Sequence, residues 1–443
     1  MTGLGLILAA PASGSGKTLI TAGLARHLRG RGLQIAAAKA GPDFIDPTFH
    51  AAATGRACIN LDVWGMRPAT LEALVAGLET TADIVLCEGA MGLFDGTGSN
   101  GETGSTAELA GIIGWPVVLV VDARGQGASV AALLRGFAGH QLQTPIAGVI
   151  FNRVSSARHA ALLAGAVAAH LPNLCCVGAL RSDPALVLPG RHRGLIPAGE
   201  IGAVDTIIDL CATQIGAALD IDRLLELACR SRIPKDAAAA APISPLGQRM
   251  AIARDQAFCF AYPALLEGWR HQGAELEFFS PLANEPPHSL ADAVFLPGGY
   301  PKLWADRLSS AEAFLGGLRR AAAHGKPIYG ECGGYMVLGR ALVDGEGRRR
   351  EMAGLLPLVT SFAERRLHLG YRSARLLGET ALGAAGARFR GHEFHYATLV
   401  CQGAADPLFA VKDAAGKDLH AARLRCGSVS GSFIHLIDRE LTH

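Results

Sequence analysis

Residues 4–18, which read LGLILAAPASGSGKT, decide the fold of this chain. The apolar first half of the stretch is typical of a buried parallel strand. After Thr18 the apolar residues recur at helical spacing as far as Gly30, which predicts an amphipathic helix. A glycine-rich turn that joins a strand to a helix and closes on Lys17 and Thr18 is the pattern of a phosphate-binding loop.

The glycine-rich turn has a chemical task for each of its residues. Gly14 and Gly16 allow successive backbone amides to face phosphate oxygens. Lys17 would reach the terminal phosphates, and Thr18 would offer its hydroxyl to Mg²⁺. Pro11 stands where the common pattern G-x-x-x-x-G-K-[ST] has its first glycine, but the phosphate-facing part of the loop is intact. The alternative is an ordinary turn between a strand and a helix, which the GKT ending disfavours.

Short apolar runs alternate with helical stretches along the whole chain. This alternation predicts an α/β fold with doubly wound, mostly parallel sheets. The expected strands are 4–10, 34–39, 84–88, 117–122, 147–152, 250–253, 276–279, 293–296 and 327–330. The run KDAAAAAPISP, which begins at Lys235, lacks a core pattern and is the best linker in the chain. We therefore expect one domain over 1–236, a linker over 237–247 and a second α/β domain over 248–443.

Composition limits the partners of the protein. The chain has 443 residues, of which 18% are charged, and its 41 basic and 39 acidic residues give a net charge of +2. Such a balance does not recruit nucleic acid or an acidic membrane surface. The ten cysteines show neither CxxC pairs nor His-spaced ligand sets, and no apolar run has the length of a membrane span. We expect a cytoplasmic protein that binds small molecules.

Two stretches dense in charge follow the second and third predicted strands. They are KAGPDFIDPTFH at 39–50 and EGAMGLFDG at 88–96. Ligands of α/β sheets bind beyond the carboxyl ends of the strands, so both stretches should lie beside the phosphate loop. Asp43 and Glu88 are the expected Mg²⁺ ligands together with Thr18, because Mg²⁺ prefers a few hard oxygen ligands. The alternative is that Asp46 and Asp95, which precede a proline and a glycine, only form turns.

A second chemical centre is expected at Cys332. The sequence PIYGECGG, residues 327–334, places this cysteine between glycines, after an apolar strand and before a helical pattern at 335–342. This arrangement is the thiol version of a nucleophile elbow. A thiol at a helix N-terminus has a lowered pKa, and the free amides there can hold an oxyanion. The pair Gly298 and Gly299 could complete that oxyanion hole.

The thiol needs a base. His435, in the sequence GSFIH, follows a short apolar run and lies far from Cys332 in sequence, as thiol–imidazole pairs normally do. His392 and His395, in GHEFHY, are the main alternative. The position after a strand favours His435.

Taken in order, the motifs resemble those of the cobyrinic acid a,c-diamide synthase family, including its hydrogenobyrinic acid members. The motifs are SGSGKT, KAGPDFIDPTFH, EGAMGLFDG, RDQAFCFAY, FSPL, LPGGYP, YGECGGYMVLG, GHEFHY and GSFIH. Members of this family join a P-loop domain similar to dethiobiotin synthetase to a class I glutamine amidotransferase-like domain. The resemblance covers both halves of the chain nearly end to end. It implies a ligase of cobalamin biosynthesis that uses ATP and glutamine to convert the a and c carboxylates of a corrin into amides by way of acyl phosphates.

The resemblance also implies roles for individual residues. Cys332 would be the glutaminase nucleophile and His435 its base. ATP would be bound by Gly14, Gly16, Lys17, Thr18, Lys39 and Asn152, the last of which could instead cap a helix. Mg²⁺ would be held by Thr18, Asp43 and Glu88. The corrin carboxylate would lie against Asp43, Phe44, Ile45, Asp46 and Asp95.

One departure from the family leaves alternatives open. Class I glutaminases usually have a Glu two residues after the His, and Ile437 occupies that position, so another group must orient His435 or the glutaminase is slow. A regulatory protein with an inactive glutaminase domain is therefore one alternative. A nucleotide switch of the partitioning-ATPase type is another, although it would carry a lysine where Ala12 stands. Among ligases, cobyrinic acid or nickel-sirohydrochlorin could be the substrate, and a homodimer is left open.

Overall fold

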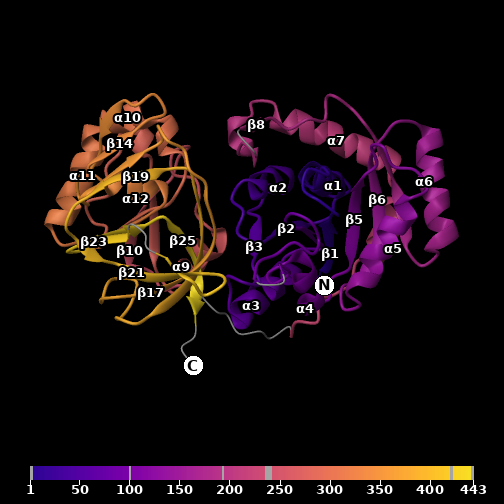
Figure 1. The fold of residues 1–443 in the computed structure, drawn as a ribbon, viewed down its shortest axis with the longest axis horizontal. Coiled ribbons are helices and arrows are strands. Elements are labelled where there is room, and N and C mark those ends of the chain that lie inside the picture. The colour runs from indigo at the N-terminus through magenta and orange to yellow at the C-terminus, as the bar shows by residue number, and fades with distance from the viewer. Residues whose placement is uncertain (1–2, 99–100, 192–193, 235–241, 420–422, 441–443) are drawn as a thin grey trace. The chain divides into compact units, whose positions relative to one another are not determined.

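The computed structural model describes residues 3–98, 101–191, 194–234, 242–419 and 423–440 (Figure 1). The chain divides into two compact units. Unit 1 comprises Met1–Trp64 and Leu71–Ala239, and unit 2 comprises Gly65–Thr70 and Ala240–His443. Residues 237–241 of the predicted linker lie outside the described residues.

Unit 1 is built on a seven-stranded parallel sheet with the strand order β3-β2-β4-β1-β5-β6-β7. The strands are β1 (Leu4–Ala9), β2 (Ile35–Ala40), β3 (Ile59–Leu61), β4 (Ile84–Glu88), β5 (Val117–Asp122), β6 (Ile146–Val154) and β7 (Cys175–Arg181). The α/β fold and the expected strands of this half are thus confirmed, while β3 and β7 were not predicted. Because the strands are parallel, their carboxyl ends meet at one edge of the sheet.

The helices of unit 1 pack in two groups. They are α1 (Lys17–Gly30), α2 (Asp46–Thr54), α3 (Pro68–Thr80), α4 (Thr106–Ile113), α5 (Val130–His140), α6 (Ala157–His170), α7 (Val204–Ala218) and α8 (Ile221–Leu227), with a 3₁₀ turn, η1, at Ala198–Glu200 and a short hairpin of β8 (Gly190–Arg191) and β9 (Gly194–Leu195). Figure 1 shows α1 beside α7, while α5 and α6 form a second pair near β6. Apolar residues of α1 and α7, such as Leu24 and Ile215, share one core with Leu6 and Leu8 of β1.

Unit 2 contains a second seven-stranded sheet, in the order β11-β10-β12-β13-β24-β23-β20. The first five strands pair in parallel and the last two pair antiparallel. The strands are β10 (Arg249–Ala253), β11 (Glu275–Phe279), β12 (Ala293–Leu296), β13 (Ile328–Glu331), β20 (Asp406–Pro407), β23 (Arg423–Cys426) and β24 (Val429–Ser432). The helices are α9 (Pro263–His271), α10 (Ala305–Ser309), α11 (Glu312–Ala323) and α12 (Gly333–Leu338), with 3₁₀ turns η2 (Pro281–Ala283) and η3 (Pro301–Leu303). The four strands expected from the sequence, β10 to β13, are confirmed.

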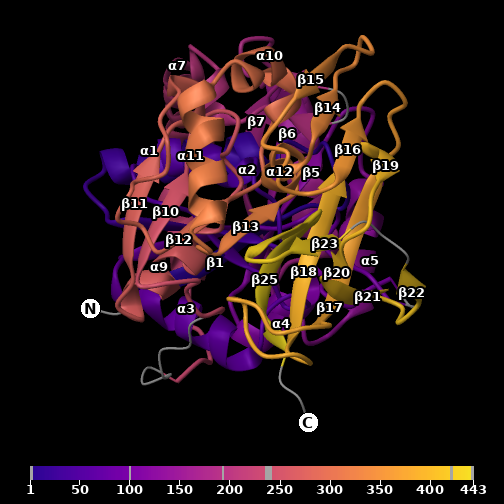
Figure 2. The same ribbon diagram turned by 90° about the vertical axis from the view of Figure 1, so that its left-hand side faces the viewer.

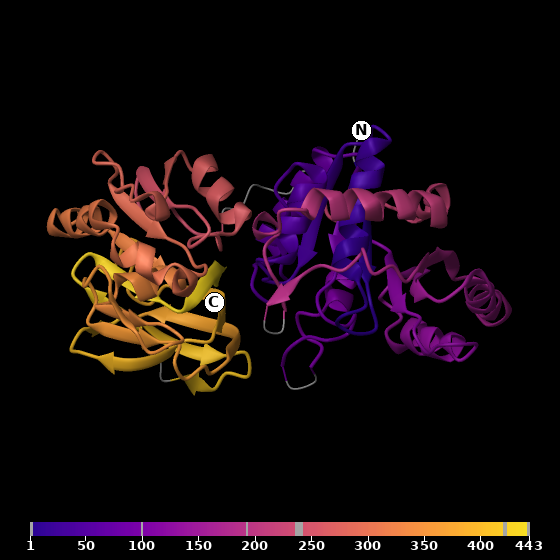
Figure 3. The same cartoon turned by 90° about the horizontal axis from the view of Figure 1, so that it is seen from above.

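Two more sheets complete unit 2, and neither was predicted. A four-stranded sheet has the order β15-β14-β16-β19, and a five-stranded antiparallel sheet has the order β22-β21-β17-β18-β25. Their strands are β14 (Ala341–Val343), β15 (Arg349–Glu351), β16 (Leu358–Ser361), β17 (His368–Leu376), β18 (Arg388–His395), β19 (Thr398–Gln402), β21 (Phe409–Asp413), β22 (Asp418–Leu419) and β25 (Ile434–Glu440). Figure 2 shows β17, β18 and β25 side by side. In Figure 3 these orange to yellow strands gather next to the salmon-coloured strands of the same unit.

The helix after the cysteine is shorter than the sequence suggested. A helical pattern was expected over 335–342, but α12 ends at Leu338 and Ala341 already belongs to β14. The amide of Gly339 closes the last turn of α12, and the amide of Arg340 bonds a carbonyl of β16. Periodicity could not separate the two cases, because a short apolar run suits a buried strand as well as a buried helix.

The length of the helices and the state of the cysteines are two further features of the chain. Within the described ranges, no helix is long and apolar enough to cross a membrane. All ten cysteines are free thiols. The buried ones other than Cys332 behave as small apolar side chains.

Gly5 of β1 tests how tightly the core of unit 1 is packed. A Cβ at this position would stand 2.1 Å from the ring of Trp115, which is fully buried and donates its Nε1–H to Glu79. Gly5→Ala should therefore lower the free energy of unfolding by about 1–3 kcal/mol. Gly77→Ala in α3, where a Cβ would meet no atom within 4 Å, should raise it by about 0.5–1 kcal/mol. Thermal unfolding checks both variants, and equal melting temperatures would contradict the packing.

Candidate functional site

The loop between β1 and α1 depends on two left-handed glycines. Gly14 has a φ of 80° and Gly16 a φ of 92°, a region that other residues rarely adopt. A Cβ on Gly16 would also stand 2.4 Å from the side-chain amide of Asn152. Asn152 uses that amide to donate a 2.8 Å hydrogen bond to the carbonyl of Ser15. Asn152, predicted to bind ATP or cap a helix, thus braces the loop from β6.

Arg153, the neighbour of Asn152, provides a second brace. Its guanidinium donates 2.7 Å hydrogen bonds to the carbonyl of Gly14 and to the carboxylate of Asp122. Asp122 is the last residue of β5, and Arg153 lies on the neighbouring strand β6. The phosphate loop is therefore held from two adjacent strands.

Lys17 and Thr18 contact the loop that follows β4. The ammonium of Lys17 donates to the carbonyl of Met91 at 2.6 Å, and the hydroxyl of Thr18 donates to Glu88 Oε1 at 2.8 Å. Lys17 is largely buried, and this burial lowers its pKa, while the charge of Glu88 acts in the opposite direction. The structure thus brings together a cation, a hydroxyl and a carboxylate at the start of α1.

Glu88 is the centre of a buried charge cluster. The Nε2 of His50 lies 2.6 Å from Glu88 Oε2, and the ammonium of Lys39 lies 3.4 Å from Glu88 Oε1. Lys39 also lies 2.8 Å from a carboxylate oxygen of Asp46 and donates to the carbonyl of Gly89. Burial lowers the pKa of Lys39, but the carboxylates of Asp46 and Glu88 outweigh it and raise the pKa above its ordinary value. Lys39, predicted to bind ATP, therefore has its charge engaged by two carboxylates.

His50 is a member of this cluster that sequence reasoning missed. Its side chain is fully buried, as is that of Glu88. The signal was present in KAGPDFIDPTFH, because Pro47 lies in the first turn of helix α2 and His50 follows about one turn later on that helix. Only the position of α2 relative to β4 reveals the contact.

Asp43 and Asp46 form a pair of hydrogen-bonded carboxyl groups. Burial, and then the charge of Asp46, raise the pKa of Asp43 to about 8. Burial also acts to raise the pKa of Asp46, but the charge of Lys39 lowers it to about 2. The opposite directions of the two pKa shifts indicate that the pair holds one proton between its two carboxyl groups near neutral pH. The Oδ1 of Asp43 accepts a hydrogen bond from the backbone amide of Ile45. This bond turns the chain through Phe44 into α2.

Asp95 closes the loop after β4 on itself. Its Oδ2 accepts the amide of Gly92 at 2.8 Å, and the next amide, that of Leu93, donates to the carbonyl of Ala10. A Cβ on Gly92 would stand 2.8 Å from the carbonyl of Pro11. The loop thus lies against the start of the phosphate loop, so Asp95 is near the predicted site but its carboxylate is partly used within its own turn.

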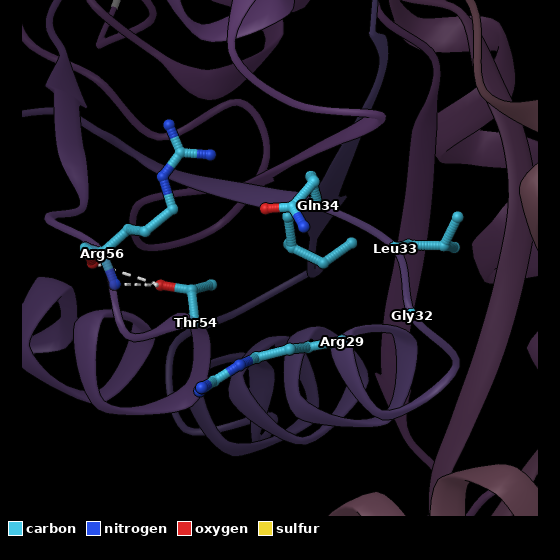
Figure 4. A pocket seen from close by; sticks show the side chains of 7 residues that line it. Arg29, Gly32, Leu33, Gln34, Thr54 and Arg56 are labelled. Carbon is cyan, nitrogen blue, oxygen red and sulfur yellow. Dashed lines mark hydrogen bonds between the residues drawn. The ribbon is translucent and has the colours of Figure 1, made fainter.

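A separate hollow of about 250 Å³ lies at the other end of β2 (Figure 4). Its lining includes Arg29 and Arg56, whose guanidinium groups donate to the backbone carbonyls of Ala53 and Thr81. Ile35, the first residue of β2, also lines it. The hollow is therefore not part of the edge where the predicted site residues gather.

In unit 2, Cys332 occupies a strained turn between β13 and α12. Its φ is 46° and its ψ is −103°, values that a non-glycine residue adopts only when its surroundings enforce them. A Cβ on Gly334, two residues after Cys332, would stand 2.0 Å from the carbonyl oxygen of Leu296, so only glycine fits at that position. The amide nitrogen of Gly299 lies 3.1 Å from the point where a Cβ on Gly333 would stand. The predicted elbow is present, with the glycine pair beside it.

His435 comes close to Cys332 just after the point where the chain changes sheets. Strand β24 ends at Ser432 in the parallel sheet and β25 begins at Ile434 in the antiparallel one. A Cβ placed on Gly298 would lie 3.0 Å from the Nε2 of His435 and 3.2 Å from the Cβ of Cys332. The imidazole of His435 and the Cβ of Cys332 therefore lie beside the same glycine.

The alternative bases occupy other positions. His395 has both ring nitrogens engaged, Nδ1 at 3.1 Å from the carbonyl of Ala397 and Nε2 at 3.0 Å from Glu393. His392 lies opposite His435 in the register of β18 with β25, and burial lowers its pKa to about 4. The geometry favours His435 as the partner of the thiol.

Burial dominates the electrostatics of the thiol and its partner. It raises the pKa of Cys332 to about 12, although the amide of Gly333 acts to lower it. Burial also lowers the pKa of His435 to about 3. The lowered thiol pKa expected from the helix N-terminus is therefore wrong for this state, and the resting pair is a neutral thiol and a neutral imidazole.

Comparison with known proteins covers both units. Residues 6–195 match the model of the CobQ/CobB/MinD/ParA nucleotide binding domain, and residues 249–440 match that of the CobB/CobQ-like glutamine amidotransferase domain. The chain is 51% identical to the hydrogenobyrinate a,c-diamide synthase of Rhizobium meliloti (strain 1021), over 98% of this chain and 99% of that protein. It is 52% identical to the protein of the same name from a Sinorhizobium species, over 98% of each chain. The protein of that name from Mesorhizobium japonicum is 48% identical over 99% of each chain.

The two domain models and the end-to-end relatives agree with the geometry of the two units. Unit 1 has the nucleotide-binding fold that the first model describes, and unit 2 holds a thiol elbow within the second. An identity near one half over the full length leaves the order of both domains unchanged. The chain therefore belongs to the hydrogenobyrinate a,c-diamide synthase family, whose members join an ATP-using P-loop unit to a glutamine amidotransferase unit.

Proposed function

We propose that this protein uses ATP and glutamine to amidate the a and c carboxylates of hydrogenobyrinate, a step of cobalamin biosynthesis. The observation that carries the proposal is the presence in one chain of two complementary centres. One is the phosphate loop with Lys17 and Glu88, and the other is the thiol of Cys332 beside His435. Each centre performs half of a reaction that neither performs alone.

Unit 1 would activate the carboxylate. A carboxylate exchanges no oxygen for ammonia unaided, so its oxygen first attacks the γ-phosphorus of ATP, ADP leaves, and an acyl phosphate forms. Ammonia then attacks the acyl carbon, phosphate leaves, and the amide remains. The backbone amides around Gly14 and Gly16 would hold the phosphates, and Lys17 would neutralise charge that builds up during the transfer.

The residues at the loop fit a Mg²⁺ ion that accompanies ATP. The hydroxyl of Thr18 and the carboxylate of Glu88 are hard oxygen groups 2.8 Å apart, and Mg²⁺ commonly takes one or two protein oxygens and keeps waters. Among the described residues no three His, Cys, Asp or Glu side chains are grouped as a metal site of their own. The ion would supply positive charge to the phosphates. Asp43 has less support as a ligand, because its carboxyl group shares one proton with that of Asp46.

Unit 2 would release ammonia from glutamine. The Sγ of Cys332 attacks the side-chain amide carbon while Nε2 of His435 takes the thiol proton. The proton passes to the departing nitrogen, ammonia leaves, and a γ-glutamyl thioester remains. Water then attacks the thioester and restores the thiol. The amides of Gly299 and Gly333, which lie close together, would stabilise the negative oxygen of each tetrahedral intermediate.

The substrate site would lie along the loop from Asp43 to Asp46 and near Asp95. Lys39 and the shared proton of the aspartate pair give this region a mixture of charges suited to a carboxylate. The relatives named above favour hydrogenobyrinate over cobyrinic acid or nickel-sirohydrochlorin as the substrate. We further propose a cytoplasmic setting, which the free thiols support. A homodimer stays a hypothesis.

The first prediction separates the two centres. Cys332→Ala should abolish synthesis with glutamine and leave synthesis with added ammonium salts, because the acyl phosphate forms in unit 1. Mass spectrometry of hydrogenobyrinic acid incubated with ATP, Mg²⁺ and either nitrogen source measures this directly. Full activity of the variant with glutamine would remove Cys332 as the nucleophile. A parallel incubation with cobyrinic acid compares the two candidate substrates.

The second prediction concerns unit 1. Lys17→Ala should reduce synthesis from both glutamine and ammonia, on the order of 10²-fold or more, because it removes a preorganised phosphate contact. Asp95→Asn should keep nucleotide affinity and accumulate the singly amidated product, since it would misplace the acceptor carboxylate. Titration with nucleotide and mass spectrometry of the products together distinguish the two variants. Loss of ATP binding in Asp95→Asn would place this residue at the nucleotide instead.

The third prediction uses the glycine that lies beside both Cys332 and the imidazole. Gly298→Ala would put a methyl group 2.2 Å from the Cε1 of His435, so the ring must move. Glutamine hydrolysis should fall about 10²-fold or more, while ammonia-dependent synthesis persists. Gly316→Ala in α11 is the control, because its Cβ would meet only the flexible end of Arg320. Equal hydrolysis rates in the two variants would contradict the arrangement.

A further inference from the structure

The two ring nitrogens of His435 face different groups. Nε2 lies beside Gly298, on the side of Cys332. Nδ1 lies 3.8 Å from the Oε2 of Glu331, the last residue of β13. The imidazole therefore lies between the thiol that it would deprotonate and a carboxyl group.

Glu331 is itself held in place. Its side chain is buried, and its Oε1 accepts the backbone amide of Leu436 at 3.1 Å. Leu436 is the neighbour of His435 on β25, so one carboxyl group contacts both the backbone of that strand and the imidazole. Glu331 also directly precedes Cys332 in the chain. It is thus fixed relative to both members of the pair.

We propose that Glu331 is the positioning residue of the glutaminase, orienting the imidazole of His435 so that Nε2 faces the thiol and stabilising the imidazolium that forms. The inference rests on the glutaminase activity proposed above. A base that takes a thiol proton works best when a third group fixes its tautomer and compensates its charge. Ile437, two residues after His435, is apolar and buried, so it supplies neither.

Burial shifts the pKa values of both Glu331 and His435 in favour of their neutral forms. It raises the pKa of Glu331 to about 8 and lowers the pKa of His435 to about 3. Each shift reflects the cost of a single charge in a dry interior. Glu331 makes proton uptake by His435 easier only as the carboxylate, and an imidazolium beside it would lower its raised pKa, because the two opposite charges then compensate each other. The 3.8 Å separation would shorten to a hydrogen bond at that point, since such contacts are often long before substrate binds.

Glu393 is the nearest rival for this role, and its contacts lead elsewhere. Its Oε2 accepts from Arg372 at 2.6 Å and its Oε1 lies 3.0 Å from Nε2 of His395. In the register of β18 with β25, Glu393 lies opposite Ile434 and not opposite His435. These hydrogen bonds therefore lie within a buried network of β17 and β18, and Glu393 acts on His435 through its charge, which opposes the lowering of that imidazole's pKa.

The test is a double-mutant cycle in the full-length protein. Glu331→Gln should lower kcat for glutamine hydrolysis between about 10² and 10⁴-fold and change KM for glutamine less than about threefold. The same substitution made in His435→Ala should have no further effect, because Glu331 acts through His435. Ammonia-dependent synthesis should equal that of the wild type in both. A role limited to packing would lower hydrolysis by the same factor in both backgrounds, and that result would overturn the proposal.

Two controls keep the result interpretable. Asp344→Asn removes another buried carboxylate of unit 2, one that bonds Arg348, and should leave glutamine hydrolysis unchanged. If Glu331→Gln does not yield folded protein, Glu331→Asp takes its place in the cycle, because the shorter side chain keeps the charge and withdraws it from Nδ1. Wild-type glutamine turnover tests the proposed function on its own, and wild-type kcat in Glu331→Gln would overturn only this inference.

Discussion

The carboxylate of Glu88 is the constraint on which unit 1 depends. It is almost completely buried at the end of β4, where an unpaired charge would cost several kcal/mol. Lys39, His50 and Thr18 compensate it, and each comes from a different element around the same sheet edge. Satisfying this one charge therefore fixes the end of β2, the orientation of α2 and the first turn of α1. The same positions are those where a nucleotide and a carboxylate would meet.

The two units treat charge in opposite ways. Unit 1 accumulates full charges in compensating sets, as would suit the proposed site for phosphates and a metal ion. Unit 2 keeps the thiol and the imidazole neutral by burying both, so charge appears only during the reaction. A permanently ionised thiol would be more open to oxidation and alkylation. On the proposed mechanism, a neutral pair would limit that reactivity to the time when glutamine is bound.

The sequence allowed the parallel strands and the chemical motifs to be predicted, but not the contacts between them. Strands β1, β4 and β5 are continuous apolar runs, because both faces of a parallel sheet are covered. The later sheets of unit 2 have mixed patterns, such as HLGYRSARL in β17, which no single period describes. His50 and Glu331 stood within quoted motifs, yet their partners are Glu88 and His435. Contacts over such separations in sequence arise from topology, which periodicity does not encode. The helix-terminus argument for Cys332 failed for a related reason, since burial depends on the whole unit.

The passage from β24 to β25 has a consequence for how this enzyme family can vary. Phe433 alone separates Ser432 in one sheet from Ile434 in the other. Side chains alternate between the two faces of a strand, so one inserted or deleted residue would turn His435 away from the thiol. The length of this segment therefore cannot change without loss of that position. Surface turns elsewhere in unit 2 carry no such restriction, and length variation among related chains should therefore concentrate in them and spare residues 428–436.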